Sequence, residues 1–204
     1  MSNKTEYKYS SEWINKLEDN YHWNLYWWQQ KLIYDYIKPN TKALEIGIGT
    51  KFASNYLKSK GVNVKTIDID IDKKPDIVAN IVDYKLNEKF DFVLAFEIFE
   101  HIPYNEFIQT LNNIKNNTDF VFMSLPILKK KVFEIKLLIP VFHHLSFNIF
   151  LPKKKITTKN HFWEIGKNSV SMNKLKNDII NSGYKITNTI TFDSFIYFVL
   201  KTNS

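Results

Sequence analysis

The most constraining feature of this sequence is the segment Lys42-Ala-Leu-Glu-Ile-Gly-Ile-Gly, in which an apolar run ends in two glycines. A short apolar run is typical of a buried strand, and closely spaced glycines are typical of a tight turn. Residues 50–60 can form a helix, which Gly61 closes just past its end. A strand, a glycine turn and a helix in this order predict the beginning of an α/β fold.

The rest of the chain continues this alternation. A helix is expected over residues 103–115, with Pro103 in its first turn, and another near residues 169–182. Several apolar runs are long enough for strands buried on both faces, which predicts a doubly wound, mostly parallel sheet with helices on both faces and a final antiparallel hairpin. Strands are expected at residues 62–69, 76–81, 90–96, 119–125, 184–192 and 195–201.

One domain is expected to span residues 1–204, with a helical cap at residues 10–38 and an insertion at about 127–160. The insertion is apolar and aromatic with lysines at both ends. It can be interpreted as a substrate lid, as an extra helical cover on the sheet, or as an amphipathic surface in which residues 127–155 touch an anionic membrane. Core packing is expected for most of the N-terminal aromatic residues, which are Trp13, Trp23, Tyr26, Trp27 and Trp28.

Composition excludes several classes of protein. The chain has no cysteine, so it has no disulfide and no thiolate metal site, and a reducing cytoplasm is the expected location. No apolar run reaches the roughly 18–20 residues of a transmembrane helix. The net charge of +7 permits an anionic partner such as a phosphorylated sugar, a membrane surface or RNA. All basic residues are lysines, which weakens the case for nucleic acid because arginine makes the bidentate contacts.

A nucleoside site is predicted where the first strand meets the first helix. Gly47 and Gly49 would let a ligand approach the backbone, and the helix N-terminus offers unpaired N–H groups. Asp68 follows at the end of the second predicted strand, about 20 residues further on, where a carboxylate can accept both hydroxyls of a ribose. The alternative is an ordinary glycine turn followed by an acidic loop residue.

The sequence also resembles the class I S-adenosylmethionine-dependent methyltransferases from about residue 42 to residue 123, and more loosely to its end. This resemblance implies a Rossmann-like α/β fold with a seven-stranded sheet, S-adenosyl-L-methionine as cofactor and S-adenosyl-L-homocysteine as product. Four segments carry it: Leu44-Glu-Ile-Gly-Ile-Gly-Thr, Thr66-Ile-Asp-Ile-Asp, Pro75-Asp-Ile-Val-Ala-Asn-Ile, and Phe90-Asp-Phe-Val-Leu-Ala-Phe-Glu-Ile-Phe-Glu-His-Ile-Pro.

The resemblance implies roles for particular residues. The methionine part of the cofactor would be bound by the glycine loop and the end of the fourth strand, the ribose by the carboxylate after the second strand, and the adenine by the residues beside that carboxylate and after the third strand. An asparagine stands where the family often has an aspartate, and its amide oxygen can accept the same bond from the adenine amino group. The methionine part would therefore contact Glu45, Gly47, Gly49, Phe96 and Glu97, the ribose would contact Asp68, and the adenine would contact Ile69, Asn80 and Ile81.

One position departs from the family pattern. Lys51 stands where a third glycine is usual. In a dinucleotide site that glycine permits close packing of helix and strand around a pyrophosphate. Because a sulfonium cofactor has no pyrophosphate, Lys51 counts against an NAD-dependent oxidoreductase more than against a methyltransferase, although it could weaken the cofactor site.

Two histidines are candidate catalytic residues. His101 lies in an EHxP turn, where a capping or structural role is favoured over that of a base or substrate contact. His161 begins the segment His161-Phe-Trp-Glu-Ile-Gly, similar to one found in this branch of the family. His161 could orient a substrate and accept a proton near neutral pH, or the segment could be a packing corner with Trp163 buried. Since His143 and His144 are adjacent and cannot share one helix face, no metal site is expected.

The resulting hypothesis is methyl transfer to an oxygen or nitrogen atom of a small-molecule or glycan-related acceptor. Two alternatives remain open, namely an RNA methyltransferase and a catalytically silent protein that binds S-adenosylmethionine. Neither the oligomeric state nor the acceptor follows from the sequence.

Overall fold

The structure is a computed structural model that describes residues 16–137, 145–152, 159–166 and 169–203. Its helices are α2 (Asn20–Ile33), α3 (Phe52–Ser59), α4 (Tyr104–Ile114) and α5 (Met172–Asn181), with 3₁₀ turns η1 (Tyr34–Tyr36), η2 (Ile71–Lys73), η3 (Phe99–His101) and η4 (Lys115–Asn117). Its strands are β1 (Lys42–Ile46), β2 (Asn63–Asp68), β3 (Ile77–Val78), β4 (Phe90–Phe96), β5 (Thr118–Pro126), β6 (Lys129–Leu137), β7 (Leu145–Pro152), β8 (Tyr184–Phe192) and β9 (Phe195–Thr202).

A seven-stranded sheet forms the centre of the molecule, with the strand order β3-β2-β1-β4-β5-β9-β8. Strands β1 to β5 are parallel to one another, whereas β9 is antiparallel to both β5 and β8. The order reverses between β1 and β4, and such a switch point is where ligands bind in open α/β sheets. The predicted parallel sheet and its antiparallel C-terminal hairpin are confirmed.

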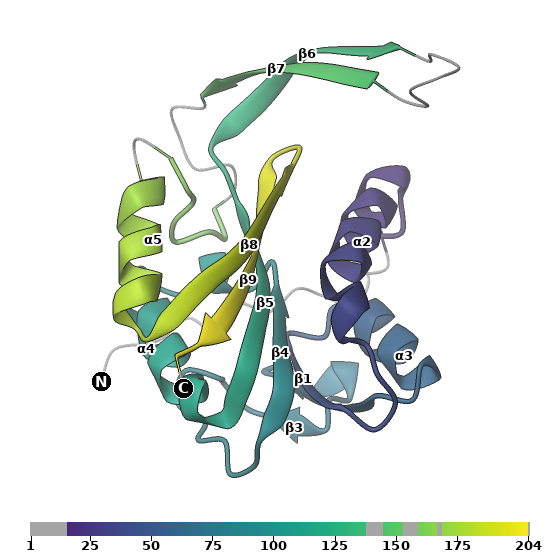
Figure 1. The fold of residues 1–204 in the computed structure, drawn as a ribbon, viewed down its shortest axis with the longest axis vertical. Helices are drawn as coiled ribbons and strands as arrows, with labels where there is room; N and C mark the ends of the chain where they lie inside the picture. The colour runs from purple at the N-terminus through teal and green to yellow at the C-terminus, as the bar shows by residue number, and fades with distance from the viewer. Residues whose placement is uncertain (1–15, 138–144, 153–158, 167–168, 204) are drawn as a thin grey trace.

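Helices cover both faces of the sheet (Figure 1). On one face, residues of α2 and α3 such as Ile33 and Leu57 pack on Phe92 and Tyr197. On the other face, residues of α4 and α5 pack on the opposite side chains of the same strands. The alternation of side chains along each buried strand produces these two hydrophobic layers. The fold is therefore doubly wound and Rossmann-like, as predicted.

Helix α2 begins at Asp19, whose carboxylate accepts a hydrogen bond from the backbone N–H of His22. It buries aliphatic residues such as Leu25 rather than most of its aromatic ones, because Trp23 is 47% and Trp27 54% exposed. The expectation that most N-terminal aromatic residues lie in the core is wrong for these two, and Trp13 lies outside the described residues. The aliphatic stripe has the spacing of one helix face and decides which side is buried.

The insertion at about residues 127–160 contains two strands, whereas one interpretation of the sequence was an extra helical cover on the sheet. β6 and β7 form a separate antiparallel ribbon, in which Phe133 lies opposite Ile149 (Figure 1). The interpretation of residues 127–160 as an extra helical cover is therefore wrong for the described strands. Apolar and polar residues alternate through Phe133-Glu-Ile-Lys, which is the period of a strand. Among the described residues, no helix is both long and apolar enough to cross a membrane.

Candidate functional site

The glycine loop joins β1 to α3 at the sheet's switch point. Gly47 and Gly49 both have positive φ, of 72° and 44°, in the left-handed region that favours glycine. A Cβ atom on Gly47 would collide with the side chain of Ile98, so this glycine is required for packing. A Cβ atom on Gly49 would meet nothing within 4 Å. Gly49 therefore borders open space, where a ligand can approach the backbone.

Asp68 is buried at the end of β2 and is bonded directly to the glycine loop. Its Oδ2 atom accepts a hydrogen bond from the backbone N–H of Ile48 at 3.0 Å, and its Oδ1 atom accepts one from Asp70 at 2.9 Å. The ammonium group of Lys73 forms an ion pair with Oδ2 at 3.0 Å. The structure thus brings Asp68 and the loop together, while the ribose-binding role of Asp68 stays a prediction.

The residue in place of the third glycine has a glycine-like backbone. Lys51 is the N-cap of α3 and has φ 63° and ψ 16°, and its side chain makes no capping hydrogen bond. The left-handed conformation costs a residue with a Cβ atom roughly 1–2 kcal/mol. This explains why a glycine suits the position, and it shows that the chain accepts the strain without losing the turn.

Replacement of Lys51 by glycine should therefore raise the free energy of unfolding by about 1 kcal/mol, since the released strain exceeds the extra entropy of the unfolded chain. Urea denaturation of Lys51→Gly and of the wild type measures the difference. Lys60→Gly is the matched control, because Lys60 has a negative φ of −96° and should gain nothing. Equal or lower stability of Lys51→Gly would contradict the strain argument.

The predicted adenine contacts are unequal in the structure. Asn80 lies in the turn after β3, and its Oδ1 atom already accepts a hydrogen bond from the backbone N–H of Val82 at 3.1 Å. Ile81 is 5% exposed and packs in the hydrophobic core, so its side chain is not available to a ligand. Ile69 is half-buried beside Asp68. All three residues stay predictions as adenine contacts.

The end of β4 carries a second strained residue. Phe96 is half-buried, and Glu97 after it has a positive φ of 57°. The backbone N–H of Glu97 donates to Oγ of Ser124 at 3.0 Å, and burial raises the pKa of the Glu97 carboxyl to about 7. Ser124 pairs with Phe96 on one side and with Tyr197 on the other. Strained residues are often found at functional sites, but Asn40, Lys74 and Asp193 also have positive φ in turns, so the position of Glu97 at the sheet's switch point is the informative feature.

Tyr197 is a candidate site residue that sequence analysis missed. Its hydroxyl group is buried and has no hydrogen-bond partner among the described residues. Tyr197 lies on β9, far along the chain from β4. Because β5 pairs with both strands, Ser124 of β5 lies between Phe96 of β4 and Tyr197. No sequence pattern signals this position.

Glu45 is buried beneath the glycine loop. Burial raises the pKa of its carboxyl to about 7, although hydrogen bonds from Ser54 act in the opposite direction. One of its oxygens, Oε2, has no partner among the described residues. An ionised carboxylate at this depth is costly, so Glu45 is partly protonated near neutral pH.

This raised pKa predicts a pH dependence of stability. Between about pH 4.5 and pH 7 the folded chain holds a proton on Glu45 that the unfolded chain has lost, so stability falls as pH rises through this window. Glu45→Gln should remove the part of that fall that Glu45 contributes and be about 2–3 kcal/mol more stable than the wild type at pH 8, with no gain at pH 4. Urea denaturation at both pH values tests this. Asp119→Asn, at an exposed position, is the control and should show no such difference.

A histidine cluster lies beside the end of β4. Nδ1 of His161 is 2.7 Å from Oε1 of the fully buried Glu164. Nδ1 of His101 is 3.0 Å from the carbonyl oxygen of Asn160, and the two imidazole rings are 4.9 Å apart. Burial lowers the pKa of His101 to about 4, so this ring is neutral at pH 7 and a weak proton acceptor.

The interpretation of this segment as a packing corner is confirmed for Trp163, whereas the proposed role of His161 toward a substrate stays a prediction. Trp163 is buried, packs against Tyr104 and Phe107, and donates its indole N–H toward the carbonyl oxygens of Phe99 and Ile102, each at 3.1 Å. Trp163 is thus the packing corner, while His161 and Glu164 on either side of it form the polar pair.

Three residues of this cluster could hold a metal ion, although none was expected from the sequence. One ligand atom each from Glu100, His101 and His161 lie within 4.8 Å of one another. Glu100 is 1% exposed, its Oε2 atom has no partner among the described residues, and burial raises its pKa well above the ordinary value. In the sequence, Glu100 and Glu164 stand out only as parts of motifs. The sequence signal for a metal site is that each glutamate lies within three residues of a histidine.

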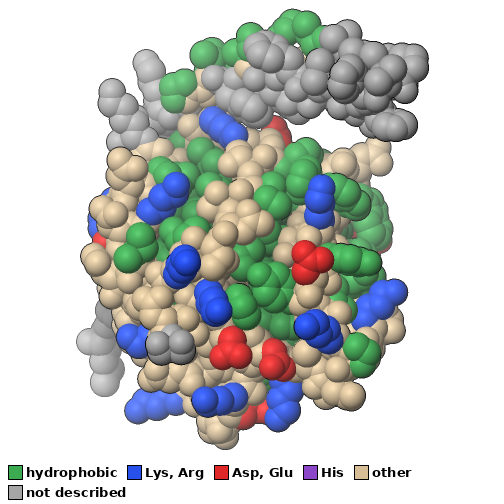
Figure 2. Space-filling view, viewed as in Figure 1, with side chains coloured by type: hydrophobic (Ala, Val, Ile, Leu, Met, Phe, Trp, Pro, Cys, Tyr) green, Lys and Arg blue, Asp and Glu red, His purple; other side chains and the backbone are tan. Residues whose placement is uncertain are grey.

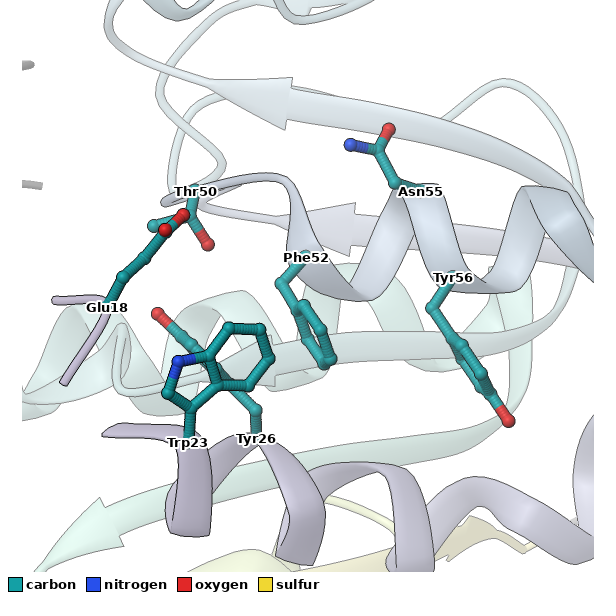
Figure 3. Close-up of a pocket in the computed structure, with 7 residues that line it drawn as sticks. All are labelled: Glu18, Trp23, Tyr26, Thr50, Phe52, Asn55 and Tyr56. Atoms are coloured by element: carbon teal, nitrogen blue, oxygen red, sulfur yellow. The ribbon is translucent and has the colours of Figure 1, made fainter. Parts of the chain in front are cut away.

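A pocket of about 350 Å³ lies between α2 and α3, next to the glycine loop (Figure 3). Trp23 and Tyr26 of α2 face Phe52 of α3, whose ring stacks on Tyr26 at 4.8 Å. Thr50 of the glycine loop lines the same pocket. Helix α2 therefore lies against the loop that borders the open space at Gly49, and the volume is in the range of small-molecule sites.

Comparison with solved structures shows the fold. The magnesium protoporphyrin IX methyltransferase of Synechocystis PCC 6803 with bound SAM has a TM-score of 0.59 and 11% identity, with 97% of this chain and 87% of that chain covered. The 1,6-didemethyltoxoflavin-N1-methyltransferase of Burkholderia thailandensis gives 0.57 and 9%, with 94% and 88% covered. The N-methyltransferase NodS of Bradyrhizobium japonicum WM9 gives 0.59 and 8%, with 93% and 91% covered. The chain thus has the fold of class I methyltransferases.

No protein-family profile matches the sequence, and a search of curated proteins finds no match. The similarity to known proteins is therefore one of structure.

Proposed function

We propose that this chain is an S-adenosylmethionine-dependent methyltransferase that acts on a small-molecule acceptor. The observation that carries the proposal is the meeting of the glycine loop, Asp68 and the strained Glu97 at the switch point of a methyltransferase-type sheet. Structural neighbours were crystallised with SAM or with S-adenosylhomocysteine. The chemistry that the cofactor supplies is a methyl group already activated on a sulfonium, so the residues of the chain have to bind, align and exclude water.

The residues present fit such a cofactor. The open space at Gly49 admits a ligand to the backbone, and Glu45 and Tyr197 present buried polar atoms without partners among the described residues. The Asp68 carboxylate would accept the ribose hydroxyls. Because two backbone N–H groups and Lys73 already occupy its acceptor positions, Lys73 has to move away when a ribose binds.

The acceptor would bind on the histidine side of Glu97. His101 lies there, in η3 just after β4, and its imidazole ring lies 4.9 Å from that of His161. A general base in this place would be His161, since His101 is a weak proton acceptor. A small-molecule acceptor agrees with the small molecules named for the structural neighbours, and a glycan-related acceptor is the narrower proposal.

Calorimetric titration of the purified chain with S-adenosylmethionine, S-adenosylhomocysteine and NAD tests the proposal. We expect micromolar binding of both sulfur nucleosides and none of NAD. Binding of neither sulfur nucleoside would overturn the proposal, and binding of NAD alone would replace it with an oxidoreductase.

An RNA acceptor is the less favoured alternative. The lysines on the face drawn in Figure 2 stand singly among acidic and apolar side chains and form no continuous basic track there. An RNA methyltransferase would bind RNA with a steep dependence on salt, which a filter-binding assay at two salt concentrations measures. A catalytically silent protein would bind the nucleosides and transfer no methyl group to any acceptor.

A further inference from the structure

We propose that Glu100, His101 and His161 form a binding site for one divalent transition-metal ion, at which the acceptor is bound through an oxygen atom. The metal site follows from geometry alone, whereas its role toward the acceptor rests on the proposed function. The three ligand atoms lie within 4.8 Å of one another, a spacing that small movements of the side chains can close around one ion.

Both histidines are held as metal-binding histidines usually are. Such a histidine donates its second ring N–H to a backbone carbonyl or a carboxylate, which fixes the tautomer and the direction of the ring. Nδ1 of His101 lies 3.0 Å from the carbonyl oxygen of Asn160, and Nδ1 of His161 lies 2.7 Å from the carboxylate of Glu164. With the proton on Nδ1 in each ring, the lone pair that a metal needs is on Nε2.

Glu100 supplies an independent indication of a cation. Its side chain is 1% exposed, and Oε2 has no hydrogen-bond partner among the described residues. A buried carboxylate in this state is costly unless a positive charge compensates it. The carboxylates of Glu97 and Glu164 also act electrostatically on the Glu100 carboxylate. A divalent cation would remove this accumulation of negative charge.

The set of ligands selects the kind of metal. Two imidazoles and one carboxylate suit first-row ions such as Mn²⁺, Co²⁺ and Zn²⁺, whereas Mg²⁺ prefers oxygen ligands. Three protein ligands leave coordination positions open, as in catalytic sites. An acceptor hydroxyl in an open position would lose its proton at a lower pH than in water. The Nε2 lone pair of His161 can bind a metal ion or a proton, but not both. With a metal bound, His161 would therefore not act as a general base, and the metal would take over that role.

The test is metal binding by the full chain without any nucleoside. The chain is stripped with a chelator and titrated with Co²⁺, followed by visible absorption, and then with Mn²⁺, Zn²⁺ and Mg²⁺ by calorimetry. We expect one Co²⁺ per chain and weaker binding of Mg²⁺. His101→Asn, His161→Asn and Glu100→Gln should each weaken Co²⁺ binding at least about tenfold, and Glu164→Gln should weaken it about 10–100-fold.

His22→Asn is the matched control, because His22 also contacts a carboxylate, that of Asp19, but lies outside the cluster. It should bind Co²⁺ like the wild type, and thermal melting verifies that every variant is folded. Absence of Co²⁺ binding at millimolar concentration, or equal binding by the wild type and the cluster variants, would overturn the site. Titration of the same samples with S-adenosylhomocysteine distinguishes the two proposals. Failure to bind this nucleoside would contradict the proposed function but would not affect the conclusion about metal binding.

Discussion

Asp68→Ala should weaken the binding of S-adenosylhomocysteine by at least about 100-fold. In the proposed complex, the Asp68 carboxylate accepts both ribose hydroxyls, and two hydrogen bonds to a charged group are together worth about 3 kcal/mol or more. The same change removes the acceptor of the Ile48 N–H and the partner of Lys73. Calorimetry with wild type and variant measures the loss in affinity.

The control for this experiment is Asp72→Ala, in the same loop. Asp72 is exposed, and its loss should leave affinity unchanged. Because Asp68 also holds the loop, Asp68→Asn, which keeps one acceptor oxygen and the shape of the side chain, is measured beside it. Nucleoside affinity in Asp68→Ala within about threefold of the wild type would contradict the ribose-binding role.

Trp163→Ala should reduce the free energy of unfolding by about 3–5 kcal/mol, the range for removal of a large aromatic side chain from a core. The indole is buried between Tyr104 and Phe107 and donates toward two carbonyl oxygens at η3, which would lose this donor. Urea denaturation measures the loss. Because Trp163 stands between His161 and Glu164, we also expect weaker Co²⁺ binding in this variant.

The matched control is Trp27→Ala. Trp27 is 54% exposed on α2, and its removal should cost within about 1 kcal/mol. A loss of less than about 1 kcal/mol for Trp163→Ala would contradict its role as a packing corner. Trp163→Phe keeps one aromatic ring but removes the indole N–H and part of the ring volume, so its loss of stability should lie below that of Trp163→Ala.

Most of the fold can be predicted from local patterns of apolar residues in the sequence. The strands that were predicted well are those whose apolar run is buried on both faces, such as β4, observed as Phe90–Phe96. β3 was predicted at residues 76–81 and is only Ile77–Val78, because the chain turns after it and Asn80 bonds to that turn. The insertion was harder, since its apolar residues suit a helix or a ribbon when the pairing partner is unknown.

Local patterns in the amino-acid sequence are enough to predict the parallel sheet, the glycine loop and the position of Asp68 next to it. These follow from short-range rules, namely the period of apolar residues and the place where consecutive parallel strands end. Lys51 was recognised as unusual from the sequence, while its left-handed backbone became visible only in the structure. The ribose, adenine and methyl-binding roles of the predicted residues stay predictions.

Contacts between residues that lie far apart along the chain follow from the three-dimensional packing. Tyr197 reaches the end of β4 because β9 pairs with β5, and His161 reaches Glu100 because Trp163 anchors its segment to η3. Neither pairing has a local signal, since each depends on how side chains far apart in the sequence fill one core. The sequence therefore predicted the nucleoside side of the site, where the residues belong to neighbouring elements. The tertiary structure brings together the residues of the proposed metal site, of which His161 lies far from the other two along the chain.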